Sequence, residues 1–180
     1  MMKHRLRAHP RGTAMAVAIG LASCMSATVR AQGPTTMADS MALAITIYGV
    51  AFTNGTQTAH AATQPELVCV QGPDPGVDPP RVVIDALQQG RAMLLRPMSA
   101  CKVMLLGAAP RGTSLVVDTL TGKRGISVSV GEPSFATDGS FTVATGYYQH
   151  GLSAASWVCK GRRRSDQSWE ITSCTMQWIS

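Results

Sequence analysis

The first third of the chain carries hydrophobic residues at the spacing of a helix. Over residues 38–53, one apolar face forms from residues three or four positions apart: Met41, Ile45, Tyr48 and Phe52. Asn54-Gly55 follows this pattern and is expected to end the helix, because both residue types are common just past a helix terminus. The pattern therefore predicts an amphipathic helix that packs against the rest of the protein.

A short strand and a second helix are expected next. Residues 66–71 (ELVCVQ) predict a strand, and the Gly- and Pro-rich stretch 72–80 predicts a loop. Residues 80–89 predict a short helix, which Asp78 can cap and which Gly90 can end.

After residue 90 the hydrophobic period changes from that of a helix to two, the period of a half-buried strand. Strands are expected over 91–96, 102–106, 113–119, 124–131, 140–149, 153–161 and 168–178. Two early helices followed by hairpins indicate an α+β fold. We expect two N-terminal helices packed on a curved antiparallel β-sheet, built as a hairpin meander, within a single domain over residues 38–180.

The N-terminus has the layout of a secretory signal peptide. Residues 1–13 are basic, residues 14–22 are apolar and uncharged, and residues 23–31 are small and mixed. The apolar run is too short to span a bilayer as a helix of the mature protein. The sequence therefore predicts export to the periplasm or the cell surface of a bacterium.

Two processing sites compete in this leader. Leu21-Ala22-Ser23-Cys24 resembles the bacterial lipobox, in which the Cys is lipidated and becomes the first mature residue. This interpretation gives a signal peptide over 1–23, a tether over 24–37 and an outer-membrane-anchored lipoprotein. Val29-Arg30-Ala31 suits ordinary cleavage after residue 31, which gives a soluble periplasmic or secreted protein.

The positive charge of the chain lies mostly in the leader. The formal net charge is +6, but five of the sixteen Lys and Arg residues precede Gln32. From Gln32 onward there are eleven basic and ten acidic residues, so the net charge there is +1. A nearly neutral domain has no broad field to attract nucleic acid, so no nucleic-acid partner is predicted.

Four of the five Cys residues remain after either cleavage, which suggests two disulfides in an oxidising compartment. Four Cys allow three pairings. If residues 153–161 and 168–178 form a hairpin with Arg164 opposite Trp169, Cys159 lies directly opposite Cys174, within reach of a disulfide. The other bridge is then Cys69–Cys101.

The C-terminal third carries Gly146-Tyr147-Tyr148, Gly151-Leu152-Ser153-Ala154, Trp169 and Trp178-Ile179-Ser180. This pattern resembles a family of uncharacterised bacterial secreted or lipid-anchored proteins, and the similarity extends weakly to Arg96–Cys101 and Asp118–Gly125. The resemblance implies that three strands form a final meander, and it implies no activity. The family usually has Asp-Gly before the Trp, where this chain has Arg164–Ser168.

Few residues suggest a catalytic, metal-binding or ligand-binding role. Gly151–Ala155 differs from a nucleophile elbow in having Ala155 where Gly is needed, so no catalytic residue is predicted. No metal or cofactor site is predicted either. Arg162–Arg164 is expected to be a solvated turn, with an anionic surface as the alternative partner. The Trp and Tyr residues of the C-terminal third are expected in the core, with a ligand cleft as the alternative.

Two functions remain after these considerations. The first is a non-enzymatic binding or structural protein of the periplasm or envelope, whose partner is unknown and whose membrane contact is the lipid anchor at Cys24. The alternative is a small-ligand module, similar to cystatin-like or NTF2-like folds, with a pocket in the concave sheet. An enzyme has no positive support in the sequence.

Overall fold

The computed structural model describes residues 33–59, 65–105, 114–151 and 153–180; the leader, its two cleavage sites and Cys24 lie outside these ranges. The elements follow the order α1 (Met37–Ala59), β1 (Leu67–Gln71), α2 (Arg81–Gln88), β2 (Leu94–Pro97), the 3₁₀ turn η1 (Met98–Ala100), β3 (Cys101–Leu105), β4 (Ser114–Asp118), β5 (Arg124–Val130), β6 (Ser134–Phe135), β7 (Ser140–His150), β8 (Ser153–Arg163) and β9 (Trp169–Ile179).

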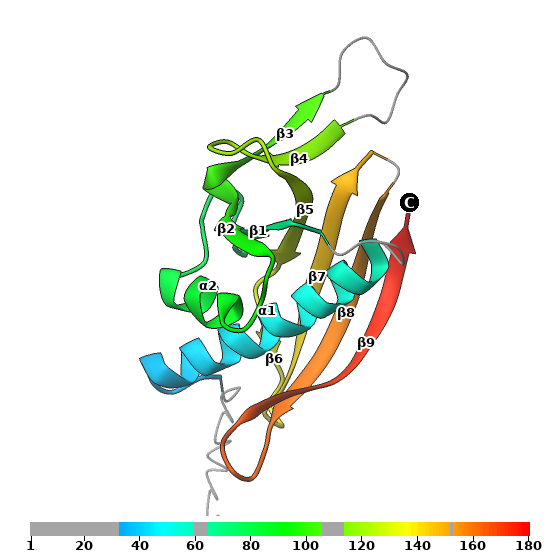
Figure 1. Cartoon of the computed structure of the whole chain (residues 1–180). Coiled ribbons are helices and arrows are strands. Elements are labelled where there is room, and N and C mark those ends of the chain that lie inside the picture. Colours follow the sequence, from blue (N-terminus) through cyan, green and yellow to red (C-terminus); the bar gives the residue numbers. More distant parts are fainter. Residues whose placement is uncertain (1–32, 60–64, 106–113, 152) are drawn as a thin grey trace, which may run out of the picture.

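The fold is α+β, as predicted, with one mixed sheet of nine strands within the described ranges (Figure 1). The path β2-β1-β5-β7-β8-β9 forms the body, β3 and β4 branch from the start of β5, and β6 pairs with β7. One expectation is wrong in detail: only α1 is N-terminal, because α2 lies between β1 and β2. The chain crosses over through α2, so β1 is parallel to β2, and it is also parallel to β5.

Helix α1 continues to Ala59, about one turn beyond the end predicted at Asn54-Gly55. Gly55 is buried against the sheet, where an added Cβ would lie 3.1 Å from both the Cβ of Tyr147 and the Cγ2 of Val128. The glycine therefore allows the helix to approach the sheet closely and does not end it. Because packing stabilises the helix here, the low helix propensity of Asn and Gly is overridden.

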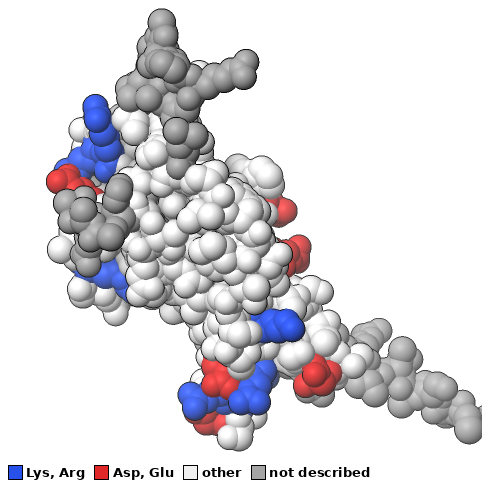
Figure 2. All heavy atoms as spheres, turned by 90° about the vertical axis from the view of Figure 1, so that its right-hand side faces the viewer, with Lys and Arg blue, Asp and Glu red and all other residues white. Residues whose placement is uncertain are grey.

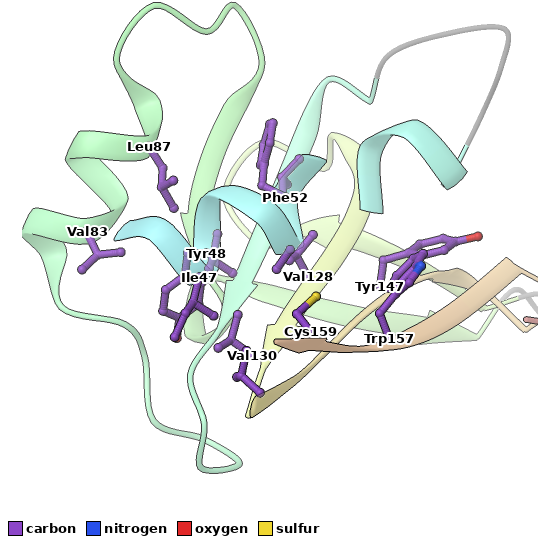
Figure 3. Packing of buried hydrophobic residues seen from close by; sticks show 14 of the residues in the cluster. Ile47, Tyr48, Phe52, Val83, Leu87, Val128, Val130, Tyr147, Trp157 and Cys159 are labelled. Atoms are coloured by element: carbon purple, nitrogen blue, oxygen red, sulfur yellow. The ribbon is translucent and has the colours of Figure 1, made fainter. Parts of the chain in front are cut away.

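The main core fills the space between the helices and one face of the sheet (Figure 3). Side chains alternate along a strand, so every second residue of β5, β7 and β8 points toward α1. Those labelled in Figure 3 are Ile47, Tyr48 and Phe52 of α1, Val83 and Leu87 of α2, Val128 and Val130 of β5, Tyr147 of β7, and Trp157 and Cys159 of β8. The opposite face of these strands carries no helix (Figure 1).

Strand β1 is buried on both faces. Val68 and Val70 belong to the main core, whereas Leu67 and Cys69 belong to a second cluster that the β3–β4 hairpin covers. Cys69 forms a disulfide with Cys101 of β3, at a sequence separation of 32 residues. This bridge fastens the β3–β4 hairpin to the centre of the sheet, and it is one of the two bridges that the sequence predicted.

The predicted cap of α2 is wrong. Pro80 occupies the cap position without a side-chain hydrogen bond. Asp78 instead accepts hydrogen bonds from the backbone N–H and the hydroxyl of Ser99, so it fixes the 3₁₀ turn η1 to the loop before α2. Gly90 follows the helix with a φ of 72°, which agrees with its expected place past the helix end.

The β8–β9 hairpin carries the second predicted bridge, Cys159–Cys174, although its tip differs from the prediction. Arg163, rather than Arg164, lies opposite Trp169. A β-bulge then leaves Thr172 unpaired and restores the register, so that Cys159 lies opposite Cys174 with a Cα–Cα distance of 4.0 Å. The bridge therefore joins the edge strand β9 to the body of the sheet.

Candidate functional site

A groove lies on the sheet face that no helix covers. Its cavity volume is about 450 Å³, and strands β5, β7, β8 and β9 contribute its floor. Its lining consists of uncharged residues, among them Ser127, Ser129, Gly146, Tyr148, Ser156 and Trp178. The groove therefore offers hydroxyl groups, backbone and aromatic rings, but no charge.

Four groove residues lie in one line across four strands. Ser129 of β5 pairs with Gly146 of β7, Gly146 pairs with Ser156 of β8, and Ser156 pairs with Trp178 of β9. We call these four residues the cross-strand row. The row has no side chain at its middle, and a Cβ added to Gly146 would be crowded, at 3.1 Å from the Oγ of Ser129, 3.2 Å from the carbonyl oxygen of Ala155 and 3.9 Å from the Cβ of Ser156.

Trp178 reaches the groove because β9 contains a second bulge. Trp157 pairs with Met176, whereas the next residue of β8, Ser156, pairs with Trp178, so Gln177 is unpaired. In a regular ladder, Gln177 would lie opposite Ser156 and Trp178 would point to the helix-covered face. The Trp178 side chain is 52% exposed, in contrast to Trp157 and Trp169, which are 6% exposed each.

The hydroxyl groups in the groove differ in their availability. The hydroxyls of Tyr148 and Ser114 hydrogen-bond to each other, and the Ser127 hydroxyl donates to the Tyr148 carbonyl oxygen at 3.4 Å. Within the described ranges, the structure gives the hydroxyls of Ser129 and Ser156 no protein partner. These two groups are free to hydrogen-bond a ligand, and each can both donate and accept.

Charged residues gather away from the groove. Figure 2 looks at the side on which β9 lies and shows a broad uncharged surface at its centre, with blue and red atoms at its margins and a mixed group of both at its lower end. That end is the β8–β9 turn, where Glu170 pairs with Arg162 at 2.7 Å and with Arg164 at 3.3 Å. Arg163 pairs with Asp39 at 3.1 Å. Each of the three arginines thus forms an ion pair, Arg162 and Arg164 with the shared carboxylate of Glu170 and Arg163 with Asp39.

A separate apolar pocket of about 270 Å³ lies beside the first half of α1. Its walls include four prolines from three segments, Pro34, Pro73 and Pro80 of one loop, and Pro133, together with Leu43 and Ile47 of the helix. Tyr48 also lines it, and its hydroxyl donates to the carbonyl oxygen of Gln71 at 3.3 Å. Burial raises the pKa of Tyr48 to about 12, so this hydroxyl stays protonated.

Asp39 holds the start of α1 to the β8–β9 hairpin. Its carboxylate accepts hydrogen bonds from the backbone N–H of Thr35 at 3.0 Å and from the indole Nε1–H of Trp169 at 2.7 Å. The Thr35 bond, then the Trp169 bond and the charge of Arg163, lower the pKa of Asp39 against the opposing effect of burial. Thr35 lies in the predicted tether, so the end of that segment contacts the domain.

Asp118 stabilises the turn between β4 and β5. Its carboxylate accepts a hydrogen bond from the Thr121 hydroxyl at 2.7 Å and one from the backbone N–H of Leu120 at 3.2 Å, and these bonds lower its pKa. Arg96 lies 4.0 Å away, beside the Cys69–Cys101 bridge. Both buried carboxylates are therefore committed to structure. In the described part of the chain, no three His, Cys, Asp or Glu side chains gather as metal ligands would.

The residues that resembled a nucleophile elbow lie at a strand-to-strand turn between β7 and β8. The Ser153 hydroxyl donates to the side-chain oxygen of Gln149 at 3.1 Å and lies 3.2 Å from the Tyr147 hydroxyl. The structure brings Tyr148 and Trp178 to the groove, whereas the side chains of Tyr147, Trp157 and Trp169 pack in the core. Ser129 and Ser156 had no signal in the sequence, because only the strand register aligns them.

Comparisons with known proteins give no further assignment. No protein family, curated protein or solved structure matches the chain. Within the described ranges, neither helix combines the length and the hydropathy that a membrane span requires. The site is therefore interpreted from its own chemistry.

Proposed function

We propose that the protein is a non-enzymatic binding domain of the bacterial cell envelope, which holds an uncharged ligand on the open face of its sheet. The cross-strand row carries this proposal. Two hydroxyls without partners, a glycine that keeps the floor low and a half-exposed indole form a surface that can hydrogen-bond and stack. Pockets with a few placed polar groups and aromatic walls are typical of ligand sites.

Export is the second part of the proposal. Two disulfides, one of which binds the edge strand to the sheet, suit a protein that folds in an oxidising compartment. The basic and apolar leader adds support, and the lipobox-like sequence before Cys24 favours a lipid anchor, with soluble export as the alternative. Radioactive palmitate should label the wild type and not Cys24→Ser. Equal labelling of the two would contradict lipidation at this residue.

The groove can be tested with neutral compounds. The ¹⁵N-labelled protein is screened by NMR against sugars, aromatic compounds and short alcohols. We expect a hit to shift the backbone signals of the cross-strand row. Shifts confined to the apolar pocket beside α1, or no shifts at all, would contradict the proposed site.

A matched pair of glycine variants sharpens this screen. Gly146→Ala places a methyl group in the floor of the groove, 3.1 Å from the Ser129 Oγ, and should weaken every groove ligand. Gly49→Ala is the control, because a Cβ there would have nothing within 4 Å. Melting temperatures of both variants show whether the fold is retained. Unchanged binding by a folded Gly146→Ala variant would refute the groove as the site.

A further inference from the structure

We infer that the ligand is a neutral pyranose oligomer, a glycan chain that lies along the cross-strand row with one sugar ring against Trp178. This inference rests on the proposed function and names its ligand class. It depends on three features of the row: the exposed indole, the free hydroxyls and the absence of charge among the groove residues.

The indole of Trp178 suits one face of a sugar. A pyranose ring carries C–H groups on its faces and hydroxyl groups around its rim, so an aromatic ring can stack on the face while the rim stays hydrogen-bonded. Trp offers a large, rigid apolar surface for such contact. Because the side chain is 52% exposed, this surface is available without rearrangement of the core.

The hydroxyls of Ser129 and Ser156 can hydrogen-bond the hydroxyl groups around the rim of a sugar ring. A sugar hydroxyl both donates and accepts, and so does each serine hydroxyl, which makes the match independent of a fixed proton direction. An acyl chain in the same place would leave both serine hydroxyls without partners as water is excluded, which is unfavourable. The apolar pocket beside α1 is the better place for an acyl group.

The length of the row favours an oligomer over a single sugar. Neighbouring strands are about 4.8 Å apart, so the row from Ser129 to Trp178 spans three intervals, or roughly 14 Å. This is longer than one pyranose ring. Ser129 and Ser156 are two intervals apart, so their Cα atoms lie roughly 10 Å apart, with Gly146 between them. Their side chains are closer, because the Ser129 Oγ and the Ser156 Cβ lie 3.1 Å and 3.9 Å from one Cβ position at Gly146, and a chain of linked rings can reach both.

Neutrality distinguishes the glycan from anionic polymers. None of the groove residues is charged: Lys160 of β8, on the same face four residues from Ser156, lies outside the lining, and at the β8–β9 turn Glu170 already pairs with Arg162 and Arg164. An anionic chain over the row would lose part of its hydration without gaining an opposite charge. A neutral chain has no such cost.

The test uses the exported protein and three uncharged probes: N-acetylchitohexaose, cellohexaose and 1-decanol. Binding is measured by calorimetry and by the emission of Trp178, whose indole is the exposed one of the three. At least one of the two hexasaccharides should bind. Trp178→Ala should weaken binding about tenfold or more, and Ser129→Ala and Ser156→Ala by about three- to tenfold each.

Two variants of β9 serve as controls. Ile179→Ala removes an exposed apolar side chain beside Trp178, and Ser173→Ala removes an exposed hydroxyl from the same strand outside the groove. Both should bind the hexasaccharide as the wild type does. If Trp178→Ala binds equally well while remaining folded, the glycan does not lie on the row and the inference is wrong.

The remaining outcomes separate this inference from the function it rests on. If neither hexasaccharide binds but another neutral compound shifts the signals of the row, the glycan is wrong and the proposed function stands. If 1-decanol shifts the row and the sugars do not, the glycan is wrong and the ligand of the proposed function is an uncharged lipid. If no neutral compound reaches the row, the inference and the proposed function both fail.

Discussion

Replacement of Trp169 by Ala should destabilise the domain more than any other single change at a tryptophan. The indole is 6% exposed and packs edge-on against Phe141 and Phe135, with ring centroids 5.7 Å and 6.0 Å away. Its Nε1–H donates to Asp39, and the Arg163 guanidinium lies 5.3 Å from its centroid. It thus joins the start of α1 to strands that are 130 residues away along the chain.

The expected loss follows from these contacts. Truncation of a buried Trp or Phe to Ala costs about 3 to 5 kcal/mol. That range already includes the contacts of the ring, and two edge-to-face aromatic pairs, each worth about 0.5 to 1.5 kcal/mol beyond the buried area, place Trp169→Ala in its upper part, at about 4 to 5 kcal/mol. With a urea m-value of about 2 kcal/mol per molar, the unfolding midpoint should fall by roughly 2 M.

Two further variants complete the assay, which is urea unfolding followed by circular dichroism. Trp169→Phe keeps an aromatic ring and removes the hydrogen bond to Asp39, so its stability should fall between the wild type and Trp169→Ala. Trp178→Ala is the exposed control and should change the free energy of unfolding by no more than about 0.5 kcal/mol. A loss below about 1 kcal/mol for Trp169→Ala would refute the place of this ring in the core.

Three other changes test the packing, the buried charge and the bridges. Gly161→Ala should cost about 1 to 3 kcal/mol in urea unfolding, because its Cβ would lie 2.3 Å from the Cζ of the buried Phe141; no loss would contradict this close approach. The pKa of Asp39 is lowered in the fold, so its contribution to stability is present above about pH 4 and disappears as pH falls through the folded pKa. Asp39→Asn should therefore lose less stability than the wild type between pH 5 and pH 3, and equal losses would show that Asp39 has no part in acid unfolding. Replacing Cys159 and Cys174 together by Ala should cost about 3 kcal/mol for a separation of 15 residues, and non-reduced peptide mapping that joins either Cys to another partner would contradict the hairpin.

Most of the secondary structure follows from the spacing of hydrophobic residues. Helix 80–89 and strand 140–149 match α2 and β7 within about one residue at each end. The parallel neighbours of β1 were missed, because the prediction assumed hairpins throughout. The continuous apolar run Leu67–Val70 was a usable signal, since a strand buried on both faces is typical of parallel pairing.

The second disulfide shows how register limits such predictions. The expected tip paired Arg164 with Trp169, whereas the structure pairs Arg163 with it. Without a bulge, the observed pairing of Arg163 with Trp169 would place Cys159 opposite Ser173 rather than opposite Cys174. The bulge at Thr172 shifts the register back by one residue, and the predicted bridge forms. The sequence therefore predicted the correct pair of cysteines from a hairpin in which the partner of Trp169 was wrong by one residue.

The candidate site depends on the same kind of local irregularity. Its members are separated along the chain by the lengths of β7, β8 and β9 and their turns, so no motif links Ser129 to Ser156 or either to Trp178. The unpaired Gln177 decides whether the indole faces the groove or the helix-covered side, because one residue of slip exchanges the two faces of a strand. A prediction that places every strand correctly but omits this bulge puts Trp178 opposite Ala155, in the core layer, and leaves Gln177 beside the serines. The site is therefore a property of the register, because the bulge places the exposed indole beside Ser156, on the face of the sheet that also carries Ser129.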